Sequence, residues 1–190
     1  MNQFSYFPGC SLHATAREYD ESIRALAREL GFTLREIDDW CCCGATPAHA
    51  LDPKAAQVLG MWNLAQATKA GDTPVLTGCA SCFSRLRAAR EEIREGPQIL
   101  HVAQVLNNPE MREKLTAKRC HPLRGLKVAC YYGCLLTRPR GEDAVDDLGI
   151  DAIAVHLLGA QMRVARPANA FLAVLVEPGR GHHVHPQLLA

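Results

Sequence analysis

Short apolar runs alternate with longer amphipathic stretches along the first half of the chain. Residues 3–7 (QFSYF) predict a strand. The stretch after it predicts a helix whose capping box runs from Thr15 to Glu18, where a hydroxyl and a carboxylate satisfy free backbone amides. Gly31 is expected to end this helix. Its buried stripe is predicted from apolar residues that recur three and four positions apart: Tyr19, Ile23, Leu26, Ala27 and Leu30.

The same order of strand and helix recurs twice more. Residues 33–37 predict a second strand, and Asp52 opens a helix that ends at Gly71. Residues 74–77 predict a third strand, followed by a helix that ends at Gly96. The inner faces are predicted to be Val58, Leu59, Trp62 and Ala65 in the first of these helices, and Phe83, Leu86, Ala89 and Ile93 in the second. This alternation predicts an α/β fold, a parallel sheet with flanking helices.

The second half of the chain predicts an unfinished copy of the first. Residues 97–119 predict two helices, the second started by Asn108 and Pro109, and residues 126–132 predict a strand. KVACYYGCLLTR resembles FSYFPGCSLHAT near the N-terminus. We therefore expect a complete module over residues 1–96, a helical connector over 97–125, and an incomplete second module with a divergent tail over 126–190. A truncated or frame-shifted reading of a longer gene and a genuine short domain both fit that tail.

The amino-acid composition limits the classes of function that this chain can have. The chain has 190 residues, and 21 basic residues nearly balance 20 acidic ones, so the net charge is +1. This balance argues against a nucleic-acid binder or a polybasic membrane adapter. We expect no membrane span, because no apolar run approaches roughly 18–20 residues, and a cytoplasmic location, because the N-terminus lacks the features of a secretory signal. Nine cysteines in such a chain favour metal or redox chemistry over disulfides.

Three cysteine groups each follow a predicted strand and precede a helix. They are Cys10, the pair Cys42 and Cys43, and the pair Cys79 and Cys82. Loops that leave parallel strands at their carboxyl ends share one edge of the sheet, so these thiols are expected to meet in one pocket. Helix N-termini at that edge favour thiolates. Four thiolates suit zinc or a cubane cluster. Five, with two adjacent, suit a larger and more open cluster better.

Four motifs carry a resemblance to a known family: YFPGC at 6–10, DWCCCGA at 39–45, GCASC at 78–82 and ACYYGCLLTRP at 129–139. Together they resemble the cysteine-rich CCG domain, and most closely the B subunit of heterodisulfide reductase. The resemblance covers residues 4 to about 139. It also sets the register of the central motif at Cys42, Cys43 and Gly44, which leaves Cys41 as an extra cysteine.

The resemblance implies a noncubane [4Fe-4S] cluster made of two fused [2Fe-2S] halves, held here by Cys10, Cys42, Cys43, Cys79 and Cys82. It also implies reduction of a disulfide, in methanogens that of coenzymes M and B, with electrons from the flavin (A) and ferredoxin-like (C) subunits of heterodisulfide reductase. Cys134 matches the first ligand of a second cluster whose remaining ligands are missing, so we read it as a remnant and expect one complete site. The alternatives are an electron-transfer CCG subunit of a succinate-, lactate- or glycolate-oxidising complex, and a non-catalytic metal-binding fragment.

The other candidate residues have plainer interpretations. Cys41 is predicted to be a neighbour and not a ligand, Cys120 a surface thiol and Cys130 part of the core. His13 and His49 lie near the cysteine loops, where a hydrogen bond to a cluster sulfur and a surface role are both open. Trp40 either shields the cluster or packs on the sheet. The three histidines near the C-terminus are read as a solvated tail: His182, His183 and His185. The chain has no glycine-rich nucleotide or flavin motif.

Overall fold

The computed structural model describes residues 3–45, 47–71, 73–118, 127–128 and 161–162. Its centre is a four-stranded parallel sheet in the order β2-β1-β3-β4. The strands are β1 (Gln3–Tyr6), β2 (Thr33–Glu36), β3 (Val75–Thr77) and β4 (Ile99–His101). A separate parallel pair joins β5 (Lys127–Val128) and β6 (Gln161–Met162). The predicted α/β class is confirmed.

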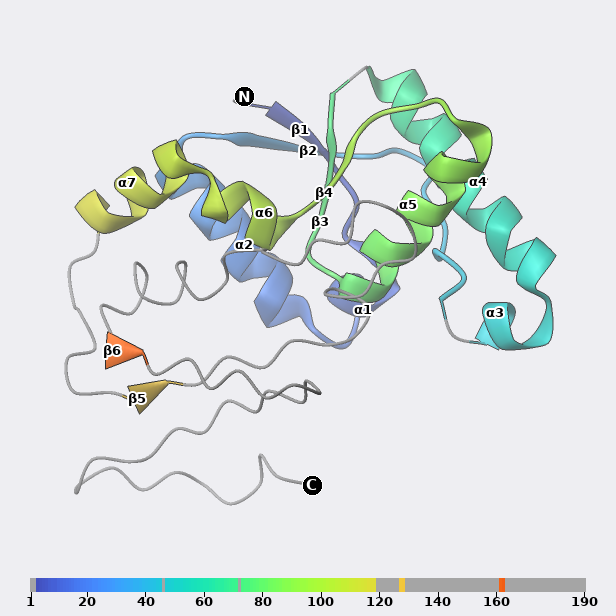
Figure 1. The fold of residues 1–190 in the computed structure, drawn as a ribbon, viewed down its shortest axis with the longest axis horizontal. Coiled ribbons are helices and arrows are strands. Elements are labelled where there is room, and N and C mark those ends of the chain that lie inside the picture. The colour runs from blue at the N-terminus through green and yellow to red at the C-terminus, as the bar shows by residue number, and fades with distance from the viewer. Residues whose placement is uncertain (1–2, 46, 72, 119–126, 129–160, 163–190) are drawn as a thin grey trace.

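Helices cover both faces of the sheet, as Figure 1 shows, with α2, α6 and α7 on one side and α4 and α5 on the other. Among the described helices, none has the length and the apolar character that crossing a membrane requires. The bounds are α1 (Gly9–His13), α2 (Arg17–Leu30), α3 (Pro47–Leu51), α4 (Pro53–Ala70), α5 (Ala80–Ile93), α6 (Val102–Asn107) and α7 (Pro109–Lys118).

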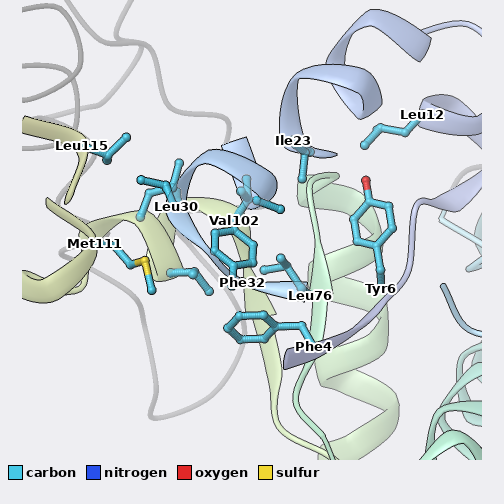
Figure 2. Packing of buried hydrophobic residues seen from close by; sticks show 14 residues of the cluster. Phe4, Tyr6, Leu12, Ile23, Leu30, Phe32, Leu76, Val102, Met111 and Leu115 are labelled. Atoms are coloured by element: carbon cyan, nitrogen blue, oxygen red, sulfur yellow. The ribbon is translucent and has the colours of Figure 1, made fainter. Parts of the chain in front are cut away.

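The core consists of one apolar cluster on each face of the sheet. Alternate residues of β1 point to opposite faces, so Phe4 and Tyr6 join the cluster under α2, α6 and α7, and Phe7 joins the cluster under α4 and α5. Figure 2 shows the first cluster, where Phe4 and Phe32 meet edge to face with ring centroids 5.5 Å apart. The inner strands β1 and β3 are therefore largely buried on both faces, whereas the edge strand β2 stays partly exposed.

The start of α2 differs from the prediction. The helix begins at Arg17 after an Ala16 N-cap with no side-chain hydrogen bond, so the capping box at Thr15 is wrong. The cause is α1, which the sequence pattern missed. The amides of Ala14 and Ala16 turn back to carbonyls of α1, and this tight turn places Thr15 outside the cap position. The predicted buried stripe holds for Ile23, Ala27 and Leu30, whereas Tyr19 is 42% exposed.

Helix α4 begins as predicted but buries a different face. Asp52 caps it by accepting hydrogen bonds from the amides of Lys54 (3.0 Å) and Ala55 (3.1 Å). The predicted inner face is wrong: Val58 is 62% exposed and Trp62 50% exposed, Ala65 is exposed too, and Leu59 is partly buried. Apart from Leu64, the buried residues are small or polar: Ala56, Gly60, Asn63, Gln66 and Ala67.

Close packing of α4 on α5 explains this choice of face. A Cβ atom added to Gly60 would lie 2.9 Å from the Cβ of Ala89, closer than two such atoms approach. Two stripes of suitable spacing run along α4, one of large and one of small residues. The small one lets the two helices approach closely, and it is this stripe that is buried.

This assignment of faces predicts a contrast between two substitutions. Gly60→Leu should lower the free energy of unfolding by about 1–3 kcal/mol, because extra methylenes in a packed interface force backbone shifts. Val58→Gln should change it by less than about 0.5 kcal/mol, because the side chain is exposed. Urea unfolding followed by circular dichroism measures both. A larger loss for Val58→Gln than for Gly60→Leu would contradict the buried face described here.

The segment after α5 contains a strand that the pattern did not predict. Helix α5 ends at Ile93, three residues before the predicted end at Gly96, and Arg94 after it has the left-handed conformation (φ 55°). Strand β4 then pairs with β3 and forms an edge of the sheet. Helices α6 and α7 follow, and α7 begins at Pro109 as predicted. Side chains from both helices belong to the same apolar cluster as Phe4.

Candidate functional site

Three cysteine-bearing loops leave the sheet at the carboxyl ends of adjacent strands. Cys10 follows β1 and lies in α1, the Cys41–Cys43 run follows β2, and Cys79 is the N-cap of α5 after β3. Because β2, β1 and β3 are neighbours in the sheet, the three loops adjoin. Figure 1 shows α1 beside the start of α5 at this end.

The five predicted ligands form one connected group of thiols. Cys82 donates hydrogen bonds to the sulfurs of both Cys43 and Cys79. Cys42 donates to the sulfur of Cys10 and also lies within electrostatic range of Cys43. Cys43 and Cys82 are buried, at 2% and 3% exposed, and Cys79 is partly buried, whereas Cys10 and Cys42 are exposed. The group is therefore closed toward the core and open on the side of Cys10 and Cys42.

Two glycines of the motifs allow the loops to come this close. Gly9 has a φ of +72°, and a Cβ atom there would lie 2.7 Å from the sulfur of Cys82. Gly44 has a φ of +76°, and its Cβ would lie 3.0 Å from the Cα of Ala56 in α4. Both backbone conformations are ones that other residues rarely adopt. Steric crowding and backbone conformation therefore explain why glycine precedes Cys10 and follows Cys43.

The pKa values of the thiols in this group are shifted in different directions. The pKa of Cys79 is lowered to about 6, first by the hydrogen bond from Cys82 and then by amides at the start of α5. A hydrogen bond from Cys82 likewise lowers the pKa of Cys43. Cys82 donates both of these hydrogen bonds, and this raises its own pKa. The Gly44 amide lowers the pKa of Cys42, but burial and the neighbouring sulfurs outweigh it and the net shift is upward. Since thiolates are the metal ligands, binding would release the remaining protons.

Cys41 also lies within electrostatic range of Cys43, but its nearest described contacts are with α4. Its amide donates to the side-chain oxygen of Asn63 at 2.8 Å, and its sulfur lies 4.0 Å from the carbonyl oxygen of Leu59. Burial raises the pKa of this thiol. Asn63 is 1% exposed and also donates to the Leu59 carbonyl at 2.9 Å, so α4 holds the start of the cysteine loop. Sequence reasoning missed Asn63, which lies in the apolar part of a helix and shows no pattern of its own.

Trp40 packs on the sheet and also orders the loop. Its ring meets those of Phe7 and His13 edge to face, with centroids 5.5 and 5.6 Å apart, and its Nε1 donates to Glu36 at 3.1 Å. Glu36 in turn accepts from Arg24 at 2.6 Å. His13 thus contacts Trp40 near the site, and His49 is exposed on α3.

His101 is a further residue that sequence reasoning missed. It is 5% exposed at the end of β4, inside a segment predicted to be helical, and its Nε2 lies 2.9 Å from the carbonyl oxygen of Gly78, next to Cys79. Burial lowers its pKa to about 4, so the ring is neutral at pH 7. The remaining candidates lie outside the described residues: Cys120, Cys130, Cys134, His182, His183 and His185.

The donor set fits an iron–sulfur group. All five contacting side chains are thiols, from three separate loops, and thiolate sulfur is the usual ligand of iron–sulfur clusters. Within the described ranges, no three His, Cys, Asp or Glu side chains are arranged to hold one metal ion. The contacts join the thiols pairwise into a chain.

The sheet and its grouped thiols define a cysteine-rich α/β domain. Residues 4–87 match the CCG family, described as a cysteine-rich domain. The chain is similar to the 8-methylmenaquinol:fumarate reductase membrane anchor subunit of Wolinella succinogenes, with 36% identity over 185 residues, 85% of this chain and 64% of that subunit. It is also similar to a protein of Archaeoglobus profundus that is named for its likeness to the B subunit of heterodisulfide reductase, with 26% identity over 158 residues, 70% of this chain and 52% of that protein.

The match confirms the predicted resemblance to a cysteine-rich CCG domain over residues 4–87. The chain spans less than two thirds of the length of either relative. Both relatives are named as reductase subunits or likenesses of them, and the heterodisulfide-type protein is the less similar of the two. The finer assignment to the B subunit of heterodisulfide reductase is therefore a proposal.

Proposed function

We propose that this chain is an iron–sulfur subunit that passes electrons within a multi-subunit oxidoreductase. The observation that carries the proposal is the connected group of five thiols at one edge of the sheet: Cys10, Cys42, Cys43, Cys79 and Cys82. The match of residues 4–87 to the cysteine-rich CCG domain supports it. Bound to these sulfurs, a noncubane [4Fe-4S] cluster would supply single-electron transfer.

The chain's own residues divide the work of holding such a cluster. Cys43 and Cys82 are buried against Phe7 and Phe83 in the core, which keeps water from the inner side. Cys10 and Cys42 are exposed, so the outer side is open to a substrate or to a partner protein. Burial of one side of a cluster and solvent access to the other influence its reduction potential and its reactivity.

For the finer activity, our first candidate is disulfide reduction in a complex like heterodisulfide reductase, whose flavin (A) and ferredoxin-like (C) subunits would be the electron donors. The similarity to the Archaeoglobus profundus protein and the open face at Cys10 and Cys42 support it. Such a reaction takes two electrons and two protons per disulfide and yields two thiols. A small disulfide would approach the thiol group from the side of Cys10 and Cys42, which is exposed.

The second candidate is electron transfer in a complex that interconverts succinate and fumarate. The 36% identity to the membrane anchor subunit of a menaquinol:fumarate reductase favours it. In that case the open face would receive a partner's redox centre and no disulfide. A non-catalytic module, with zinc or a cluster in a structural role, is a third outcome of the test below.

The test is reduction of a disulfide by the cluster-loaded chain with excess reduced viologen. If the first candidate holds, the mixed disulfide of coenzymes M and B oxidises the viologen at two equivalents per disulfide, and free thiols appear in step. A loaded chain that is reduced by viologen and re-oxidised by a quinone, but leaves the disulfide unchanged, would exclude the first candidate and support the second. A loaded chain that exchanges no electrons would contradict both. The control is Cys42→Ala, which removes an open-face ligand.

A further inference from the structure

The peptide group between Gly78 and Cys79 is held on both sides by buried side chains. The Cys79 amide donates to the hydroxyl oxygen of Thr77 at 3.3 Å. The Gly78 carbonyl oxygen lies 2.9 Å from Nε2 of His101. These two backbone atoms belong to one peptide unit, so both of its polar groups are occupied by side chains. Each holding residue is buried, Thr77 at 0% and His101 at 5% exposed.

The second nitrogen of His101 determines which way the bond to Gly78 runs. The amide of Ala103 donates to Nδ1 at 3.2 Å, as part of the cap of α6. Nδ1 is therefore the acceptor nitrogen, and in the neutral ring the proton is on Nε2, where it points to the Gly78 carbonyl. Protonating Nδ1 would break the cap. His101 is thus fixed as a donor toward the cysteine loop.

The two holding residues are themselves held in place. Thr77 and His101 are register partners in the parallel pair of β3 and β4, and both end their strands. The ring of His101 packs edge to face on Phe83, with centroids 5.8 Å apart, and its backbone amide donates to the side chain of Gln104 at 2.8 Å. Strand pairing therefore sets both donor and acceptor at fixed positions around one peptide bond.

We propose that Thr77 and His101 are positioning residues that fix the Gly78–Cys79 peptide and so direct the Cys79 sulfur toward the cluster. This inference rests on the proposed function, because it takes Cys79 as a ligand. The φ angle of Cys79 (−94°) sets the direction of its Cα–Cβ bond, and rotation of the clamped peptide would change it. The Thr77 bond also keeps the Cys79 amide away from sulfur, and amide hydrogen bonds to sulfur change the potential of such clusters.

Amide hydrogen exchange in the metal-free 190-residue chain tests the clamp directly. We expect a slow Cys79 amide in the wild type and exchange at least about tenfold faster in Thr77→Val, which keeps the shape but removes the acceptor. Thr77→Ser keeps the acceptor and should restore slow exchange. The Phe7 amide, which donates to the Leu76 carbonyl at 2.9 Å on the same edge, should not change in any variant. Equal Cys79 rates in wild type and Thr77→Val, or parallel acceleration at Phe7, would overturn the clamp.

His101→Asn separates capping from positioning. Asparagine is a good N-cap and should still accept the Ala103 amide, but it is too short to reach the Gly78 carbonyl. We expect α6 to remain folded and the Cys79 amide to exchange faster. If this variant does not fold, the Thr77 pair still decides the question. An unchanged Cys79 rate in folded His101→Asn would remove His101 from the proposal.

The cluster-loaded chain then tests the consequence. At equal iron content, Thr77→Val and His101→Asn should show altered EPR spectra and a midpoint potential shifted in the positive direction, with Thr77→Ser like the wild type. Identical spectra and potentials in all four proteins would overturn the positioning role while leaving the proposed function intact. If the wild type takes up no iron, the proposed function fails, and the exchange rates of the metal-free chain still decide whether the clamp exists.

Discussion

Replacing Cys43 with alanine is expected to reduce the iron and acid-labile sulfide held by the chain to background. Cys43 is 2% exposed and lies between Cys82 and Cys42, so its loss removes the inner link between two loops. Cys42→Ala should have the same effect, because it removes the link to Cys10. Iron and sulfide assays after anaerobic reconstitution measure both.

The matched controls are cysteines outside the group. Cys41→Ala should keep the cluster, because that thiol faces a carbonyl of α4 and burial raises its pKa. Cys120→Ala should also keep it, since Cys120 is predicted to be a surface thiol. Equal loss of iron from Cys43→Ala and from either control would contradict the assignment of ligands.

Acid is expected to destabilise the fold through His101. The folded-state pKa of about 4 lies below the ordinary value of 6.5, because burial disfavours the charged ring. The neutral ring therefore contributes stability above pH 6.5, and this contribution is lost as the pH falls from 6.5 through 4. A shift of this size corresponds to about 3 kcal/mol in the free energy of unfolding.

The measurement compares wild type with His101→Asn, because carboxylates also titrate in this range. Urea unfolding at about pH 7.5, 6, 5 and 4 should show the stability difference between the two proteins falling by about 3 kcal/mol. Most of the fall should occur between pH 6.5 and 4. A difference that does not depend on pH would mean that the His101 ring is not buried in its neutral form.

The arrangement of strands and cysteines could be predicted because it depends on local order along the chain. Apolar runs such as residues 3–7 and 33–37 form strands where expected, and each cysteine group follows one of them. Parallel pairing then places all three loops at one edge, which is a property of the fold class. Contact among the thiols follows from that placement, and the structure shows it.

The residues that hold the loops could not be predicted, because their partners are set by tertiary geometry. Asn63, Thr77 and His101 each bind a backbone group outside their own strand or helix, and no spacing rule identifies such contacts. The prediction of the buried face of α4 was wrong for a related reason. Hydrophobicity alone favours burial of Val58 and Trp62, whereas close packing of α4 on α5 favours burial of Gly60. Strand β4 has only three residues, too few for its pattern to stand out.

The most direct test of the central claim is the content of iron, acid-labile sulfide and zinc per chain, measured on one sample purified or reconstituted without oxygen. One [4Fe-4S] cluster on the five cysteines predicts about four irons and matching sulfide per chain, with little zinc. Zinc without sulfide, or no metal at all, would contradict an iron–sulfur centre at this site.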